Sequence, residues 1–292
     1  MKKSTLYAAS AVAMWATLAA TTKLLLNGIP NFETLAICSA IAAIFLLFFT
    51  LYTGGRKAFR AYSGRQYFRM SYLGALGIFL YNAFYFYGIS QLSSQTACIL
   101  NYLWPVMLVL FSCLILKERL TLWKILALFC SFVGVIILTA DGSALSGGGH
   151  PILGAIACVL DAVAYGLFSV LNKKDDVDQG VMMTVSWAVS AVLSAGIGLA
   201  VESWVPLSWG QILSFLWFGI IPNALAYLLW AMALKNSEES ASLSNMAYAV
   251  PFLSLMVSAV LLKERIQFSA VLALVFIVGG ILMQSLLGKK KA

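Results

Sequence analysis

The chain has 292 residues, of which 62% are hydrophobic and only 10% are charged. A soluble domain carries about 25% charged residues, so this composition excludes a soluble globular protein and predicts a surface that faces lipid. The net charge of +8 does not indicate nucleic-acid binding, because the lysines and arginines stand in short segments between apolar runs. With one histidine and five scattered cysteines, the chain has almost nothing from which to build a metal site or a histidine-based catalytic triad.

Ten apolar segments follow one another along the chain, and each is long enough to cross about 30 Å of hydrocarbon as a helix. They are residues 5–26, 32–53, 69–91, 94–116, 121–140, 151–172, 179–201, 209–234, 240–262 and 266–287. The first also has features of a signal peptide, since two lysines precede its apolar run. We assign it to the folded protein, because the stretch from Trp15 to Lys23 is echoed from Tyr165 to Lys173.

The distribution of lysine and arginine predicts the orientation of these segments in the membrane. With the N-terminus in the cytoplasm, sixteen of the 19 basic residues lie in cytoplasmic segments, and only Lys23, Lys263 and Arg265 lie outside. The positive-inside rule therefore places both termini in the cytoplasm. The glycine- and serine-rich connection at 141–150 then lies outside.

One pattern occurs twice, 146 residues apart: a tyrosine, a proline and a serine precede a Lys-Glu-Arg triplet. Its copies are Tyr102, Pro105, Ser112, Lys117, Glu118 and Arg119, and then Tyr248, Pro251, Ser258, Lys263, Glu264 and Arg265. The duplication predicts two related halves, 1–140 and 151–292, joined by an external linker at 141–150. Because five spans per half is an odd number, the halves must insert in opposite senses, as an inverted repeat.

Each Lys-Glu-Arg triplet stands between two predicted helices, and we interpret it as an interfacial turn. Its cations complement the end of the preceding helix, and its glutamate suits the start of the following helix. Pro105 and Pro251 lie near mid-span, where a residue without a backbone N–H kinks or loosens a helix. They are candidate bending points, and simple curvature of the helix stays open as the alternative.

Aromatic and amide side chains gather in the predicted spans near these prolines. Interfacial belts account for many membrane aromatics, but not for polar aromatics near mid-span. The pattern favours a polar, aromatic-lined cavity in the centre of the bundle. Its candidate substrate-binding residues are Trp15, Tyr81, Tyr85, Asn101, Trp104, Tyr165, Asn245 and Tyr248.

Asp161 is the only acidic residue deep in a predicted span. Ionisable groups within a membrane are costly and are candidates for function. Asp161 could take part in proton coupling, bind a substrate ammonium group, or hold helices together through a hydrogen bond, and the sequence leaves these alternatives open. No lysine or arginine lies equally deep, which argues against phosphate-bearing substrates. Two related halves in an apolar chain are typical of secondary transporters. Because the sequence has no nucleotide-binding loop, such transport would run downhill or on an ion gradient.

With its matched prolines, Lys-Glu-Arg triplets and glycines Gly134 and Gly280, the chain resembles the EamA-type branch of the drug/metabolite transporter superfamily. Within it, the opening lysines, Trp15 and the run from Asn101 to Pro105 are similar to bacterial aromatic amino-acid exporters of the YddG type. The resemblance implies ten helices around a central cavity, alternating access and a place in the bacterial inner membrane. It also implies tolerance of several neutral amino acids.

We therefore expect an all-α integral membrane protein that exports aromatic and other neutral amino acids from the cytoplasm, without a cofactor or metal. Its partners would be the small-molecule substrate and the lipid bilayer, and not nucleic acid. Because one chain already holds both halves, a monomer is expected. An exporter of another small metabolite or drug stays open, and an intramembrane enzyme or a structural or signalling membrane protein is a more remote alternative.

Overall fold

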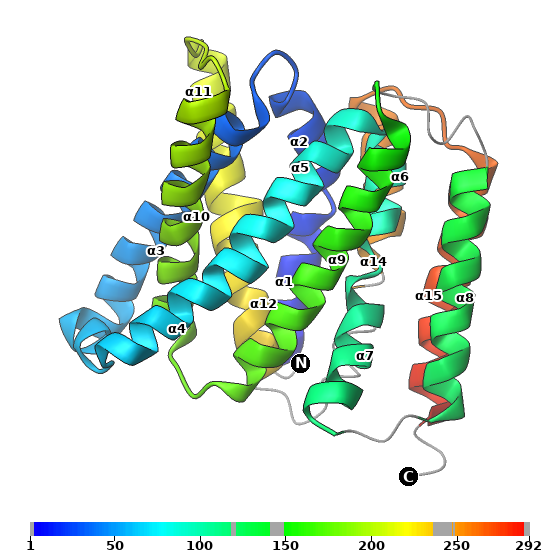
Figure 1. Ribbon diagram of the computed structural model, residues 1–292, viewed down its shortest axis with the longest axis horizontal. Helices are drawn as coiled ribbons and strands as arrows, with labels where there is room; N and C mark the ends of the chain where they lie inside the picture. Colours follow the sequence, from blue (N-terminus) through cyan, green and yellow to red (C-terminus); the bar gives the residue numbers. More distant parts are fainter. Residues whose placement is uncertain (1–2, 118–120, 141–148, 236–246, 248, 289–292) are drawn as a thin grey trace.

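The computed structural model describes residues 3–117, 121–140, 149–235, 247 and 249–288, which form a bundle of helices (Figure 1). This described part contains no strand. The elements are α1 (Lys3–Trp15), α2 (Leu18–Leu25), α3 (Asn31–Arg60), α4 (Gly64–Gly74), η1 (Ala75–Leu80), α5 (Tyr81–Gln91), α6 (Ser94–Asn101), α7 (Trp104–Ile115), α8 (Leu122–Ala140), α9 (Pro151–Lys174), α10 (Gln179–Val201), α11 (Trp209–Phe218), η2 (Gly219–Leu225), α12 (Ala226–Lys235), α14 (Ala249–Leu261) and α15 (Phe268–Gly288). The two η elements are π-helical.

Seven described segments are long and apolar enough to cross a membrane, namely Lys3–Leu25, Asn31–Arg60, Gly64–Gln91, Ser94–Ile115, Pro151–Lys174, Gln179–Val201 and Trp209–Lys235. They coincide with the first four predicted spans and with the sixth, seventh and eighth. The other three predicted spans contain shorter apolar helices, Ile125–Ile137, Ala249–Leu261 and Phe268–Gly280. The expectation of an all-helical membrane protein is confirmed, and ten full spans stay a prediction.

The outside of the bundle is apolar, as a lipid-facing surface requires. Trp209 is 83% exposed and Phe268 is 81% exposed, whereas Asp161 and Ser190 are completely buried. Buried polar groups pair between helices, as the hydroxyls of Ser39 and Ser190 do at 2.9 Å between α3 and α10. In hydrocarbon such groups must find partners within the protein.

Several spans are interrupted halfway. The first breaks at Ala16–Thr17, where the Thr17 hydroxyl donates to the Met14 carbonyl at 2.8 Å. The fourth breaks before Pro105, which is the second residue of α7, a position where the missing N–H costs little. The third and eighth spans contain π-helical segments, and Pro222 lies inside the second of them. Such interruptions occur frequently at functional sites of membrane and soluble helices.

The halves share local features at equivalent positions. Lys117 and Lys263, which open the two Lys-Glu-Arg triplets, both have a φ of 55°. This left-handed conformation is uncommon for a residue other than glycine, so its occurrence in both copies marks the same turn. The π-helical segments also correspond, because η1 ends just before Tyr81 and η2 ends two residues before Tyr227.

Helices α8 and α15 pack through equivalent glycines and lie side by side at one edge of the bundle (Figure 1). A methyl group on Gly134 would come within 2.8 Å of the Ala273 carbonyl oxygen, and one on Gly280 within 3.2 Å of the Ala127 carbonyl oxygen. The pairs 127–280 and 134–273 run in opposite directions along the two helices, so α8 and α15 are antiparallel. Each helix offers its partner the same contact, which is the reciprocity of a two-fold interface.

Candidate functional site

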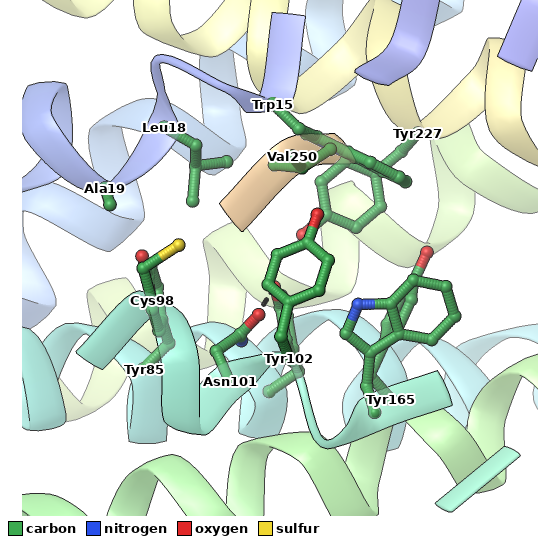
Figure 2. Close-up of a pocket in the computed structure, with 12 residues that line it drawn as sticks. Trp15, Leu18, Ala19, Tyr85, Cys98, Asn101, Tyr102, Tyr165, Tyr227 and Val250 are labelled. Atoms are coloured by element: carbon green, nitrogen blue, oxygen red, sulfur yellow. Dashed lines mark hydrogen bonds between the residues drawn. The ribbon is translucent and has the colours of Figure 1, made fainter. Parts of the chain in front are cut away.

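A cavity lies at the centre of the bundle, where the interrupted spans meet (Figure 2). Its lining contains no charged side chain among the described residues. The lining residues are Trp15, Leu18, Ala19, Tyr81, Tyr85, Cys98, Asn101, Tyr102, Trp104, Tyr165, Tyr227 and Val250. The structure thus brings six of the eight predicted substrate-binding residues to one space. Asn245 and Tyr248 lie outside the described residues.

The helix breaks position these side chains. Trp15 is the last residue of α1, Asn101 is the last of α6, and Trp104 is the first of α7. Pro105 has no N–H to give to the Asn101 carbonyl, and the N–H groups of Val106 and Met107 both bond to the Leu103 carbonyl instead. The end of α6 and the start of α7 therefore meet at the cavity, and their dipoles bring partial charges of opposite sign there.

The aromatic rings around the cavity pack against one another. The Tyr81 and Tyr165 centroids are 4.9 Å apart, and the Trp104 and Tyr165 centroids are 5.2 Å apart in an edge-on arrangement. Trp15 meets the Tyr227 ring edge-on at 5.3 Å. These separations fall within the favourable range for aromatic pairs. The rings form a connected wall that includes members of both halves.

In this conformation the rings nearly fill the centre. The central cavity measures about 30 Å³ for the centre of a water-sized sphere, which is room for about two water molecules. A second cavity of about 170 Å³ adjoins it, and Tyr165 and Tyr227 line both. The second cavity extends to Lys173 and Lys235 at the ends of α9 and α12. The two tyrosine rings therefore separate the centre from a wider space at that end of the bundle.

The opposite end of the bundle is closed by hydrogen bonds. The Lys23 ammonium donates to the carbonyls of Ile89 and Leu92 at 2.6 and 2.7 Å, at the end of α5. The Glu264 carboxylate accepts from the backbone N–H of Ser94 at 3.1 Å and from its hydroxyl at 2.8 Å. Glu264 thus caps α6, in the first half of the chain. We expected it at the start of the following helix, but α15 has no acidic residue in its first turn.

Beside the central cavity, a polar chain leads to Asp161. The Asn101 amide nitrogen donates to the Tyr81 hydroxyl and to Oδ1 of Asp161, both at 3.1 Å. Asp161 is completely buried and does not line the cavity. Its Oδ2 has no hydrogen-bond partner in the described part of the chain. Asn101 is therefore the contact between the cavity and the buried carboxyl group.

The sequence profile of the EamA-like transporter family matches residues 2–140 and 152–286. The chain belongs to the EamA-like transporter family. It is a multi-pass membrane transporter rather than an enzyme. The two matched segments correspond to the two predicted halves, so each half of this EamA-family chain carries one copy of the family's repeat.

Two bacterial relatives each share about a quarter of the aligned residues with this EamA-family transporter. The uncharacterized transporter YyaM of Bacillus subtilis is 26% identical over 263 residues, which are 84% of this chain and 81% of the relative. The aromatic amino acid exporter YddG of Ancylobacter novellus is 26% identical over 220 residues, or 74% of this chain and 76% of the relative. A solved crystal structure with 24% identity superimposes with a TM-score of 0.76 over 98% of each chain, which shows a shared fold.

Some cavity residues of the transporter were not among the predicted site residues. Tyr227 lies 146 residues after Tyr81, and Val250 lies 146 residues after Trp104, so the internal repeat is the signal that could have found them. Cys98 gives no such signal, because a cysteine in an apolar helix is usually a small packing residue. Pro105 and Pro251 are both buried, and each directly follows a cavity residue, Trp104 or Val250.

Proposed function

We propose that this transporter exports neutral amino acids, chiefly aromatic ones, from the cytoplasm by alternating access. The observation that carries the proposal is the central cavity, whose described lining combines aromatic rings with one amide and no charged side chain. An aromatic side chain gains by packing against such rings. The relative named as an aromatic amino acid exporter supports the same substrate class.

A zwitterionic substrate needs partners for both of its charges in a site that excludes water. The Asn101 amide oxygen and the carbonyl end of α6 are suited to an ammonium group, and the N-terminus of α7 to a carboxylate. Trp15 adds a further donor for the carboxylate. Its Nε1 is buried without a hydrogen-bond partner in the described part of the chain. An unpaired buried donor costs the protein free energy, and a ligand that accepts a hydrogen bond from it removes this cost.

For the membrane topology we propose ten spans, with both termini in the cytoplasm. Residues 1–140 and 151–292 would form two inverted five-helix repeats, joined by an external linker at 141–150. Reciprocal contacts support this symmetry. A methyl group on Gly74 would clash with Ser186, and one on Gly219, 145 residues after Gly74, would clash with Ile41, 145 residues before Ser186.

Alternating access would come from rocking of the two halves, with Pro105 and Pro251 as bending points. In the proposed orientation the wider cavity, which extends to Lys173 and Lys235, faces the cytoplasm. The closed end with Lys23 and Glu264 faces outside. The structure would then represent a state that is closed to the outside and narrow at its centre. Since one chain holds both halves, the monomer would be sufficient for transport.

Release of substrate from liposomes tests the proposed function. Purified protein in liposomes preloaded with labelled phenylalanine or tryptophan should release the label several-fold faster than protein-free liposomes. Trp209→Ala, at a lipid-exposed position, serves as a control variant that keeps this flux. Absence of acceleration for every neutral amino acid would refute the substrate class. A different class of neutral metabolite, such as an aromatic amine, would then be the next substrate to test in the same liposomes.

A further inference from the structure

We propose that Asp161 is a proton-binding site that communicates with the substrate through Asn101. Protonation of the Asp161 carboxyl and binding of a substrate ammonium group at the Asn101 amide oxygen would exclude each other, so that the transporter exchanges a proton for each substrate. This inference rests on the proposed function, since it concerns how the same cavity handles the ammonium group. Its starting point is the placement of one amide between the cavity and a buried carboxyl group.

The direction of the Asn101 amide follows from the charge of its neighbour. An ionised carboxylate can only accept hydrogen bonds, so the amide must present its NH₂ group to Asp161, as it does at 3.1 Å. Figure 2 shows the amide oxygen of Asn101 on the side of the cavity residues, while the amide nitrogen donates to the Tyr81 hydroxyl and to Asp161. The oxygen is then placed to accept from an ammonium group. Through the amide, an ionised Asp161 favours a cation in the cavity.

Protonation reverses this arrangement. A protonated Asp161 carries one O–H donor, and the Asn101 amide, which already bonds to Oδ1, can accept from it through its oxygen. Rotation of the amide by half a turn satisfies this donor and puts the NH₂ group where the amide oxygen was, at the proposed ammonium position. There the NH₂ group opposes an ammonium group, because two donors face each other. The orientation of the Asn101 amide therefore depends on the protonation state of Asp161. The ionised state favours an ammonium group in the cavity, and the protonated state disfavours it.

The internal repeat argues that this polar pair does not serve packing alone. The residue equivalent to Asn101 in the second half is Ala247, 146 residues later. The residue equivalent to Asp161 in the first span is Ala11, at the 150-residue offset that relates Trp15 to Tyr165. Both alanines are completely buried. The fold therefore fills the equivalent positions with small apolar side chains, and a buried carboxyl group with an unpaired Oδ2 is costly by comparison.

No basic side chain neutralises Asp161 within the described residues, where the ion pairs involve Asp175 and Asp176. The titratable groups that face it are the tyrosines Tyr81 and Tyr85 from α5, Cys98 from α6 and Cys158 from its own helix. None of them carries a positive charge in any protonation state. A proton or a nearby ammonium group is therefore what can balance the carboxylate, and the geometry allows one of them at a time.

The exchange balances as follows. With the cavity open to the cytoplasm and Asp161 ionised, a zwitterionic amino acid binds with its ammonium group at Asn101. After the cavity opens to the outside and the substrate leaves, a proton from the external water binds Asp161. The protein returns with this proton and releases it to the cytoplasm. One neutral substrate leaves and one proton enters in each cycle, and no other reactant is needed.

Liposomes with an acidic interior test this exchange. With the interior at about pH 6, the exterior at about pH 7 and the membrane potential clamped at zero, proton exit should drive labelled phenylalanine inward against its gradient. Equal stoichiometry allows an accumulation of up to about tenfold for one pH unit. The isosteric variant Asp161→Asn removes the proposed proton site and should not accumulate phenylalanine. Cys158→Ser, which changes a buried neighbour outside the cavity lining, is the matched control and should still accumulate the substrate.

Binding by the wild-type protein gives a second readout that does not depend on the folding of a variant. Lowering the pH from about 7 to about 5 leaves both charges of phenylalanine in place, yet its affinity should fall at least tenfold as Asp161 takes up a proton. The affinity for 3-phenylpropionate, which lacks the ammonium group, should not fall in parallel below about pH 7. The change in tryptophan fluorescence on binding, to which Trp15 and Trp104 in the cavity contribute, reports both affinities.

The outcomes separate the exchange from the transport function itself. Downhill phenylalanine flux without accumulation by the wild type would overturn the exchange and leave the proposed function standing. Accumulation that persists in Asp161→Asn would overturn Asp161 as the proton site. Equal pH dependence for phenylalanine and 3-phenylpropionate would overturn the role of the ammonium group. Absence of flux for every neutral amino acid would overturn both the function and the exchange.

Discussion

Replacement of Glu264 by glutamine should open the end of the transporter that the structure shows closed. Glu264 joins the halves of the chain, because both of its carboxylate oxygens accept from Ser94, through the backbone N–H at 3.1 Å and the hydroxyl at 2.8 Å. Glutamine keeps one acceptor oxygen and loses the negative charge. The variant therefore loses one bond to Ser94 and the charge at the N-terminus of α6 and beside Lys23.

The size of the effect follows from these losses. A hydrogen bond to a charged group contributes about 1.5–3 kcal/mol, and a charge at a helix terminus about 0.3–1 kcal/mol. If the contacts exist only in the closed state, their loss of about 2–4 kcal/mol changes the ratio of open to closed molecules about 30- to 850-fold. The change is expected in this equilibrium rather than in overall stability, since the rest of the bundle is unchanged.

Cys98 provides the assay, because it lines the central cavity. In a variant whose other four cysteines are replaced, a membrane-impermeant maleimide added outside intact cells reports how often the cavity opens to that side. Glu264→Gln should speed labelling of Cys98 at least tenfold. Glu202→Gln is the matched control: Glu202 also accepts two backbone N–H groups, from Phe32 and Glu33, at 3.0 Å each, but it caps α3, away from the cavity. Unchanged labelling in Glu264→Gln, or an equal increase in Glu202→Gln, would refute the reasoning.

Three further predictions concern the cavity, the helix packing and the topology. Trp104→Ala should lower phenylalanine flux in liposomes at least tenfold with expression intact, because it removes a ring from the cavity wall, and flux equal to that of Trp209→Ala would return Trp104 to a packing role. Gly280→Ala should lower the free energy of unfolding in detergent by about 1–3 kcal/mol through overpacking, which a lower melting temperature would report. The control Gly279→Ala should not lower it, because a methyl group there meets nothing within 4 Å. A reporter that is active only in the cytoplasm should work when fused after Ala292, and silence of this fusion would contradict the proposed orientation.

The sequence was informative where a residue's role depends on its own span. Near mid-span an amide or tyrosine needs a polar environment, so Asn101 and Tyr81 could be assigned to a cavity from their depth alone. The internal repeat could have extended this assignment to Tyr227, which lies 146 residues after Tyr81. The family membership and the helical fold followed from the same apolar segments and duplicated motif.

The sequence was not informative where a role depends on a partner far along the chain. Glu264 caps a helix that begins 170 residues earlier, and no local spacing indicates that contact. The spacing predicted instead that Glu264 serves the next helix, which is the commoner arrangement. The near closure of the cavity was equally hidden, because it depends on how rings from separate spans, such as Tyr165 and Tyr227, approach one another.

The two halves share helix contacts and turn conformations, but they contribute different side chains to the cavity. The helix packing is similar in both halves, because α8 and α15 contact each other through equivalent glycines. The lysine that opens each Lys-Glu-Arg triplet also has the same left-handed backbone conformation. The cavity is asymmetric, because the repeat places Val250 at the position equivalent to Trp104 and Ala247 at the position equivalent to Asn101. In the proposed alternating access, equivalent contacts in the two halves would let them tilt either way at similar cost. The proposed zwitterionic substrate would bind in this asymmetric cavity, where Asn101 lies at the break between α6 and α7. Exchanging Val250 for tryptophan should therefore alter substrate fit without creating a second ammonium site, since the second half offers no counterpart of Asn101.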